Sequence, residues 1–172
     1  MSIRPFEGHP PSLDRLPLLA VDIDGVISLF GFEERPQGSS FRFQLVDGIP
    51  HFISLAAGER LLRLSESFEL VWASGWEDKA NFYLPELLGL PELPHVSFEV
   101  EARAGDAHWK LAAIEAYVGD RPFAWIDDNF DASCYEWAER RPQPTLLVPT
   151  EPHLGLEEGH VEALNAWAVS LH

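Results

Sequence analysis

Two aspartates directly follow a short apolar run near the start of the chain. The run Leu18–Val21 has the all-apolar composition of a strand buried on both faces, and Asp22-Ile23-Asp24-Gly25 comes next. In an extended segment the side chains of Asp22 and Asp24 point to the same side. Carboxylates at the end of a buried strand are costly unless a cation or a reaction requires them. The pair therefore predicts a cation-binding or catalytic site, at the edge where open α/β sheets bind ligands.

Three further groups of polar residues occupy comparable places. Ser74 and Gly75 end a second apolar run and precede a predicted helix, an arrangement that binds anions through backbone N–H groups. Asp127 and Asp128 end a third apolar run. Lys110 lies in an otherwise apolar predicted helix shortly before that run. The order of these residues along the chain predicts one site that combines carboxylates with anion-binding groups.

Each of these positions also has a purely structural interpretation. Asp127 and Asp128 could cap the helix that follows them. Ser74 could cap its own helix with Glu77 completing a capping box, although capping is compatible with anion binding. A lysine on a helix usually lies on the solvated face, so Lys110 taken alone is weak support. The functional hypothesis therefore depends on the whole set and not on any single member.

The elements that must position these residues alternate along the chain as repeated β-α units. Predicted strands cover Leu18–Val21, Leu70–Ala73, Val96–Val100, Phe123–Ile126 and Thr145–Val148. Predicted helices cover Pro50–Ser67, Glu77–Leu88, Ala107–Tyr117, Ala132–Arg140 and Leu156–Leu171. We expect an α/β fold with a five-stranded parallel sheet and helices on both faces. The length and the apolar content suit a single domain over residues 1–172.

One segment interrupts the alternation. Residues 27–48 are too many for a tight connection between the first strand and its helix. Phe41–Leu45 alternates with period two, and the polar stretch Glu34–Ser40 contains Pro36 and Gly38. The insert, at about residues 28–48, therefore predicts a β-hairpin flap with its tip at residues 34–40, over the acidic turn. Its aromatic residues are expected to be core more often than substrate-contacting.

The composition limits the partners of the protein. A formal net charge of -16 repels phosphate backbones and anionic membranes, so a phosphorylated substrate must be drawn in by a local cation. The single Cys134 excludes an internal disulfide, and the N-terminal residues lack the apolar core of a signal peptide. No stretch is long and apolar enough to span a membrane. We expect a cytoplasmic protein whose oligomeric state the sequence leaves open.

The ordered motifs Asp22-Ile23-Asp24-Gly25-Val26, Ser74, Lys110 and Asp127-Asp128 resemble those of the haloacid dehalogenase (HAD) superfamily of phosphohydrolases. The resemblance runs from about Leu18 to Val148. More narrowly, the sequence is similar to the HAD-type domains grouped with Swiss army knife RNA-repair proteins. This narrower similarity lies in residues 71–78, 125–128 and 146–148, and in the final helix with Trp167.

The resemblance implies a Rossmann-like fold and a two-step mechanism. The first strand would be central, flanked by the strands that end at Ser74 and Asp127. Asp22 would be the nucleophile that forms an aspartyl-phosphate, and Asp24 the general acid and base. Equatorial phosphoryl oxygens would be bound by Ser74, the Gly75 N–H and Lys110.

Mg²⁺ is the cofactor that the resemblance implies. Its ligands would be the carboxylates of Asp22 and Asp127 and the backbone carbonyl of Asp24, with Asp128 as a further or water-mediated ligand. The chain lacks room for a large cap domain between Ser74 and Lys110. Expected substrates are a nucleotide, another small phosphomonoester or a phosphoprotein, whereas the net charge disfavours a nucleic-acid end. The alternative function is a regulatory or binding module of the same fold without significant turnover.

Overall fold

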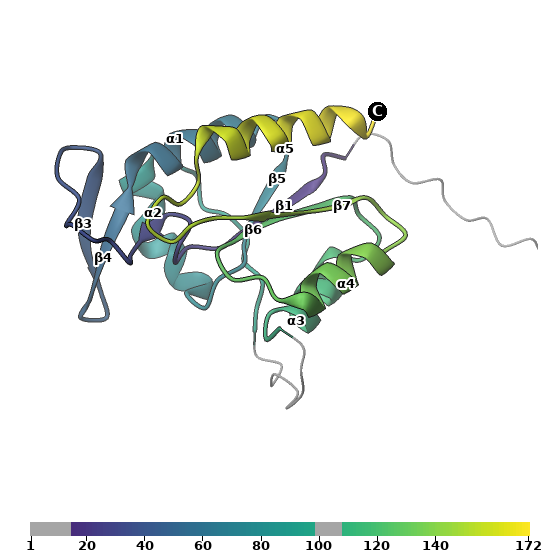
Figure 1. Cartoon of the computed structure of the whole chain (residues 1–172), viewed down its shortest axis with the longest axis horizontal. Helices are drawn as coiled ribbons and strands as arrows, with labels where there is room; N and C mark the ends of the chain where they lie inside the picture. Colours follow the sequence, from purple (N-terminus) through teal and green to yellow (C-terminus); the bar gives the residue numbers. More distant parts are fainter. Residues whose placement is uncertain (1–14, 99–107) are drawn as a thin grey trace, which may run out of the picture.

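The computed structural model of this protein describes residues 15–98 and 108–172. Its centre is a sheet of four parallel strands in the order β5-β1-β6-β7 (Figure 1). These strands are β1 (Leu18–Val21), β5 (Glu69–Trp72), β6 (Phe123–Asp127) and β7 (Thr145–Pro149). As expected, the first strand is central and pairs with β5 on one side and with β6 on the other. The residues that follow these three strands therefore meet at one edge of the sheet.

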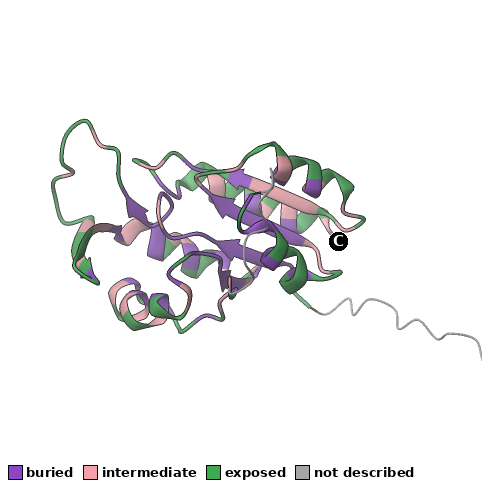
Figure 2. Ribbon diagram, turned by 90° about the horizontal axis from the view of Figure 1, so that it is seen from below, coloured by how far each residue is buried: buried purple, intermediate pink, exposed green. Residues whose placement is uncertain are grey.

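Helices cover both faces of this sheet, as expected (Figure 1). They are α1 (Leu55–Leu64), α2 (Ala80–Leu88), α3 (Leu111–Val118), α4 (Ala132–Arg140) and α5 (Glu158–Ser170). In β1, Leu19 and Val21 pack into the core shared with α1, α2 and α5, whereas Leu18 and Ala20 pack with residues of α3 and α4. The central strands are buried on both faces (Figure 2), which explains why their sequences are uniformly apolar.

The expected fifth strand, Val96–Val100, is not formed over its described residues 96–98, and residues 99–100 lie outside the described part of the chain. Instead, His95 makes a single parallel bridge with Trp72 at the outer side of β5. The Trp72 N–H donates to the Pro94 carbonyl at 2.9 Å, and the Val96 N–H donates to the Trp72 carbonyl at 2.8 Å. Pro94 has no N–H with which to extend a ladder, so the pairing stays at one residue.

The insert after β1 forms a second, antiparallel sheet in the order β2-β4-β3. Its strands are β2 (Ser28–Leu29), β3 (Phe41–Val46) and β4 (Ile49–Ser54), and the β3–β4 hairpin lies at one end of the molecule (Figure 1). A hairpin was expected, but its predicted tip at residues 34–40 is wrong. The turn is Asp47-Gly48, in which both residues have positive φ, 50° and 80°. Asp-Gly between alternating strands is a strong hairpin signal that the sequence interpretation missed.

The same error displaced the start of the first helix. The predicted helix Pro50–Ser67 includes most of β4, which pairs with β3 along its whole length. The helix α1 begins only after Ser54, whose side chain accepts a hydrogen bond from the Ala57 N–H at 3.2 Å. Ser54 is therefore the N-cap that separates strand from helix. The predicted start of the third helix, Ala107, lies outside the described residues, and α3 begins after Lys110.

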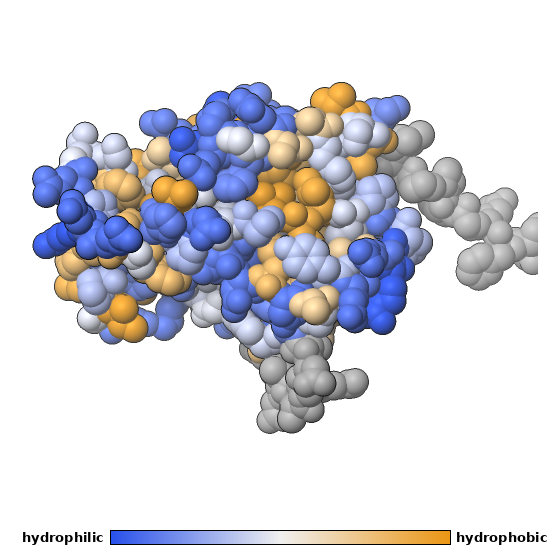
Figure 3. All heavy atoms as spheres, viewed as in Figure 1, coloured by the Kyte–Doolittle hydropathy of each residue, from blue (hydrophilic) through white to orange (hydrophobic). Residues whose placement is uncertain are grey.

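Figure 3 shows a face that is mostly hydrophilic, with apolar side chains gathered near its middle, where the edge strand β7 runs. Among the helices of residues 15–98 and 108–172, none is long and apolar enough to cross a membrane.

Candidate active site

All seven residues singled out from the sequence line one pocket of about 210 Å³ at the carboxyl edge of the parallel sheet. Asp22 follows β1, Asp127 ends β6, and Ser74 comes two residues after β5. The pocket is lined by Asp22, Asp24, Ser74, Gly75, Lys110, Asp127 and Asp128, together with His108, Trp109 and Asn129. Three of the four segments meet because the parallel strands before them end at the same edge, and the fourth, residues 108–110, directly precedes α3.

Lys110 is buried between two carboxylates. Its Nζ lies 2.9 Å from Asp22 Oδ1 and 2.7 Å from Asp127 Oδ2. The residues are only 3% (Lys110), 6% (Asp22) and 1% (Asp127) exposed. The alternative of a solvated helix lysine is therefore wrong: Lys110 stands at the N-terminal boundary of α3, and its ammonium group joins the ends of β1 and β6.

The protonation of these groups is set by burial and by their mutual charges. Burial raises the pKa of Asp22 to about 7; Lys110 lowers this pKa and Asp127 raises it. Burial by itself lowers the pKa of Lys110, but Asp22 and Asp127 outweigh burial and hold that pKa above its usual value. Burial and then Asp127 also raise the pKa of Asp128. Three carboxylates therefore share one ammonium group, which leaves negative charge that a further cation could neutralise.

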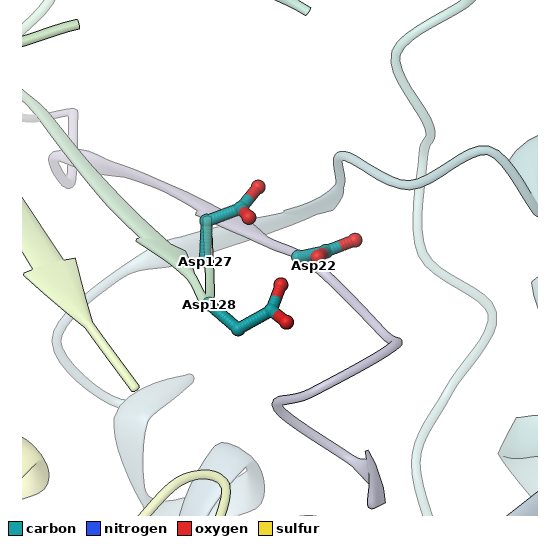
Figure 4. A group of neighbouring side chains, drawn as sticks. All are labelled: Asp22, Asp127 and Asp128. Atoms are coloured by element: carbon teal, nitrogen blue, oxygen red, sulfur yellow. The ribbon is translucent and has the colours of Figure 1, made fainter. Parts of the chain in front are cut away.

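The carboxylates of Asp22, Asp127 and Asp128 are arranged so that they could hold a metal ion. One oxygen of each lies within 4.8 Å of the others, and the side chains extend to the same side (Figure 4). Oxygen donors of this kind suit a hard cation such as Mg²⁺. Gly25 makes room for this arrangement, since a Cβ at that position would lie 2.4 Å from Asp128 Cγ, and its φ of 79° also favours glycine.

Asp24 has a different environment from Asp22. Its side chain is 50% exposed at the pocket, and both of its oxygens have partners from other segments. The Trp76 Nε1–H donates to Asp24 Oδ2 at 3.1 Å, and His51 Nδ1 of β4 lies 3.5 Å from Asp24 Oδ1. Neither Trp76 nor His51 was singled out from the sequence as a functional residue. An accessible carboxylate with a fixed orientation suits proton transfer to and from a substrate.

The capping alternatives do not account for the motif residues. The short 3₁₀ helix Glu77–Lys79 precedes α2, and neither element has a side-chain cap at its N-terminus. Ser74 Oγ instead accepts from the Trp76 N–H at 3.3 Å, and the Glu77 side chain accepts from the Phe98 N–H, so the predicted capping box is wrong. The helix α4 is capped by Asp131, and not by Asp127 or Asp128.

His108 is a pocket residue that the sequence interpretation missed. Its Nε2 lies 2.8 Å from the Asn129 carbonyl and therefore carries the proton, whereas Nδ1 accepts from the Lys110 N–H at 3.2 Å. His108 thereby ties the start of α3 to the loop after β6. The signal that the sequence offered was its position two residues before Lys110, one of the motif residues.

The aromatic residues of the hairpin face away from this pocket. Phe43 packs edge-to-face on Phe52, with ring centroids 5.8 Å apart, on the side of the hairpin opposite to His51. Phe32 packs on the same ring at 6.1 Å. The expectation that these residues are core is wrong, because Phe30 and Phe43 are exposed and Phe32, Phe41 and Phe52 are only half-buried.

A family model described as "HAD domain in Swiss Army Knife RNA repair proteins" matches residues 18–161 of the chain. The match covers all the elements from β1 to the start of α5, and it includes every residue of the pocket. No curated protein matches the chain.

Proposed function

This chain belongs to the family of HAD domains in Swiss Army Knife RNA repair proteins, and we propose that it is an Mg²⁺-dependent phosphomonoesterase that forms an aspartyl-phosphate on Asp22. The observation that carries the proposal is the buried Lys110 between Asp22 and Asp127, in a pocket that also contains Ser74 and Asp24. A nucleophile, an anion-binding cation and an exposed acid thus face the same space. This combination suits phosphoryl transfer better than a purely structural role.

In the first step Asp22 would attack the phosphorus atom of the monoester. A P–O bond to the Asp22 carboxylate forms, and the P–O bond to the leaving group breaks. Asp24, which is accessible at the pocket, gives its proton to the departing oxygen. In the second step Asp24 takes a proton from water, which attacks the phosphorus, releases inorganic phosphate and restores the Asp22 carboxylate.

The charge that develops on the phosphoryl oxygens needs partners. Lys110 and the Ser74 hydroxyl line the pocket beside Asp22, and the Gly75 N–H belongs to the same segment as Ser74. These groups would bind the equatorial oxygens, where the transition state carries its charge. Mg²⁺, held by the carboxylates of Asp22, Asp127 and Asp128 and by the Asp24 carbonyl, would supply further neutralisation of the phosphoryl group when bound.

Binding of Mg²⁺ should stabilise the fold more at pH 8 than at pH 5. Because the pKa of Asp22 is raised from 3.8 to about 7, its ionisation makes the metal-free fold less stable as the pH rises through this window. The cation binds ionised carboxylates and should remove this penalty. Thermal unfolding with and without MgCl₂ at the two pH values, at constant ionic strength, measures the effect. An equal shift of Tm at both values would contradict the assignment.

A nucleotide is the substrate class that the pocket supports best. Trp109 lines the pocket with 46% of its surface exposed, and its ring centroid lies 5.3 Å from Lys110 Nζ. A flat apolar ring beside the proposed phosphate-binding groups can stack on the base of a nucleotide. The RNA-repair association of the family makes a nucleic-acid end the second candidate, against which stands the net charge of -16.

The experiment that tests the function is a phosphate-release screen with and without chelator. Its substrates are an aryl phosphate, a nucleoside monophosphate, ribose 5-phosphate, a phosphopeptide and an end-phosphorylated oligonucleotide. We expect Mg²⁺-dependent release from the aryl phosphate, and a higher kcat/KM for the nucleotide than for ribose 5-phosphate. Undiminished activity in excess chelator would contradict the metal assignment. Release from none of the substrates, with Mg²⁺ still bound, would favour the alternative of a binding module.

A further inference from the structure

We propose that His51, supplied by the β3–β4 hairpin, is a positioning residue that holds the Asp24 carboxylate for protonation of the leaving group. This inference rests on the proposed role of Asp24 as the general acid. It assigns a function to the hairpin, which is placed beside the pocket but contributes none of its lining residues.

The contacts of His51 connect three segments at Asp24. Its Nδ1 lies 2.8 Å from Ser28 Oγ and 3.5 Å from Asp24 Oδ1. Its ring packs edge-on against the Trp76 indole at 4.8 Å between centroids, and the Trp76 Nε1–H donates to the other oxygen, Asp24 Oδ2. The two rings therefore support each other and also the two oxygens of one carboxylate. The hydrogen bond of Nδ1 is to Ser28, and this bond holds the ring 3.5 Å from Asp24 Oδ1. Without the His51 ring, Oδ1 would lose this contact and Trp76 would lose the ring that packs against it, so the carboxylate could rotate.

The hairpin is fixed well enough to provide this support. The strand β2 pairs with β4 through Ser28 and Ile53, and Ile53 is fully buried. The turn residue Asp47 forms an ion pair with Lys79, next to the start of α2. The His51 side chain itself is only 13% exposed. A partly buried ring with contacts on several sides can hold a neighbouring carboxylate within the narrow range of orientations that proton transfer requires.

The chemistry predicts a specific signature. A poor leaving group, such as the alkoxide of an alkyl phosphate, depends on a proton from the acid, whereas the weakly basic aryloxide of p-nitrophenyl phosphate departs without one. The parameter kcat/KM reports on steps up to the first irreversible one, which here is formation of the aspartyl-phosphate. A defect in positioning Asp24 should therefore lower kcat/KM for the alkyl phosphate much more than for the aryl phosphate.

Two variants of His51 and one control distinguish the effect of the ring from the effect of its Nδ1 atom. His51→Phe keeps the ring against Trp76 but removes Nδ1, and His51→Asn places an amide nitrogen near the position of Nδ1. Gln44→Ala is the matched control, because Gln44 is the cross-strand partner of His51 in the hairpin. We expect His51→Phe to lower kcat/KM about 30- to 100-fold for an alkyl phosphate and less than about 3-fold for the aryl phosphate. His51→Asn should recover part of the loss, and Gln44→Ala should resemble the wild type.

A second measurement does not depend on turnover. The Trp76 indole N–H signal, assigned by its absence in Trp76→Phe, should exchange faster with solvent in His51→Phe than in the wild type, because the Asp24 acceptor is no longer held. Equal losses on both substrates would show a merely structural role, and unchanged kinetics or exchange would also overturn the inference. If the wild type hydrolyses neither substrate, the proposed function fails, while the exchange rates still decide whether His51 holds Asp24.

Discussion

Replacement of Asp22 by asparagine should lower the turnover of a phosphomonoester by at least about 10⁴-fold, because the variant lacks the nucleophile on which the mechanism depends. The amide is nearly the same size as the carboxylate, so the buried position at the end of β1 remains filled. The variant should also be at least as stable as the wild type at pH 8. Burial raises the pKa of Asp22, which means that its ionised form disfavours the metal-free fold at that pH.

Trapping with beryllium fluoride identifies the residue that carries the phosphoryl group. The wild type should bind this mimic in the presence of Mg²⁺, and Asp22→Asn should not bind it. The control is Asp120→Asn, which changes an exposed aspartate that is not among the lining residues of the pocket. Near-normal turnover by Asp22→Asn would exclude a covalent intermediate on this residue, even if the protein proved to be a phosphatase.

Replacement of Lys110 by methionine should lower turnover by about 10²- to 10³-fold, the usual effect of losing one group that stabilises charge in the transition state. The structure adds a second expectation, which concerns stability. Without the ammonium group, Asp22 and Asp127 would face each other as buried carboxylates, and breaking a buried ion pair by removing one partner costs about 3 to 5 kcal/mol. Steady-state kinetics and urea unfolding measure the two effects.

A pair of controls separates catalysis from folding. The chain has one other lysine, Lys79, which is exposed, and Lys79→Met should keep near-normal turnover of the aryl phosphate, a substrate that does not depend on the hairpin's support of Asp24. The double variant Asp22→Asn/Lys110→Met removes one of the two facing carboxylates and should recover part of the lost stability, although it cannot recover activity. Wild-type kinetics in a folded Lys110→Met variant would return this lysine to a structural role.

The amino-acid sequence was enough to predict the alternation of strands and helices and the residues that meet at the carboxyl edge of the sheet. Uniformly apolar runs identified β1, β5, β6 and β7. Strands that helices cover on both faces have no solvent-exposed face, so their sequences lack alternating polar residues. The carboxylates and Ser74 were found because polar groups at the ends of buried strands are costly unless they have a function. Lys110 was found by its place in an otherwise apolar predicted helix and in the order of the motifs. The topology of parallel strands then implied their convergence, and one pocket contains them all.

Local patterns were less reliable where extended and helical segments adjoin. The hairpin was expected, but its turn was assigned to residues 34–40 because proline and glycine occur there, whereas Asp47-Gly48 forms the turn. The segment Val96–Val100 has a strand-like composition, yet its described residues 96–98 form no strand, and the preceding His95 makes a single bridge with β5. In the hairpin the local Asp47-Gly48 signal was present but was overlooked. After His95, by contrast, pairing with a neighbouring strand decides the conformation, and a local stretch of sequence does not show that neighbour.

The contacts that hold the motif residues could not be predicted from the sequence. Lys110 is buried between two carboxylates, Trp76 donates a hydrogen bond to Asp24, and His51 approaches Asp24. The residues in each of these contacts lie 17 to 88 positions apart in the sequence. Local propensity and periodicity depend on neighbours within a few positions, so they carry no information on such contacts. The physical reason is that neighbouring side chains set the orientation of a side chain at a sheet edge. Here these neighbours come from the β3–β4 hairpin and from the loop after β5, which are distant in the sequence.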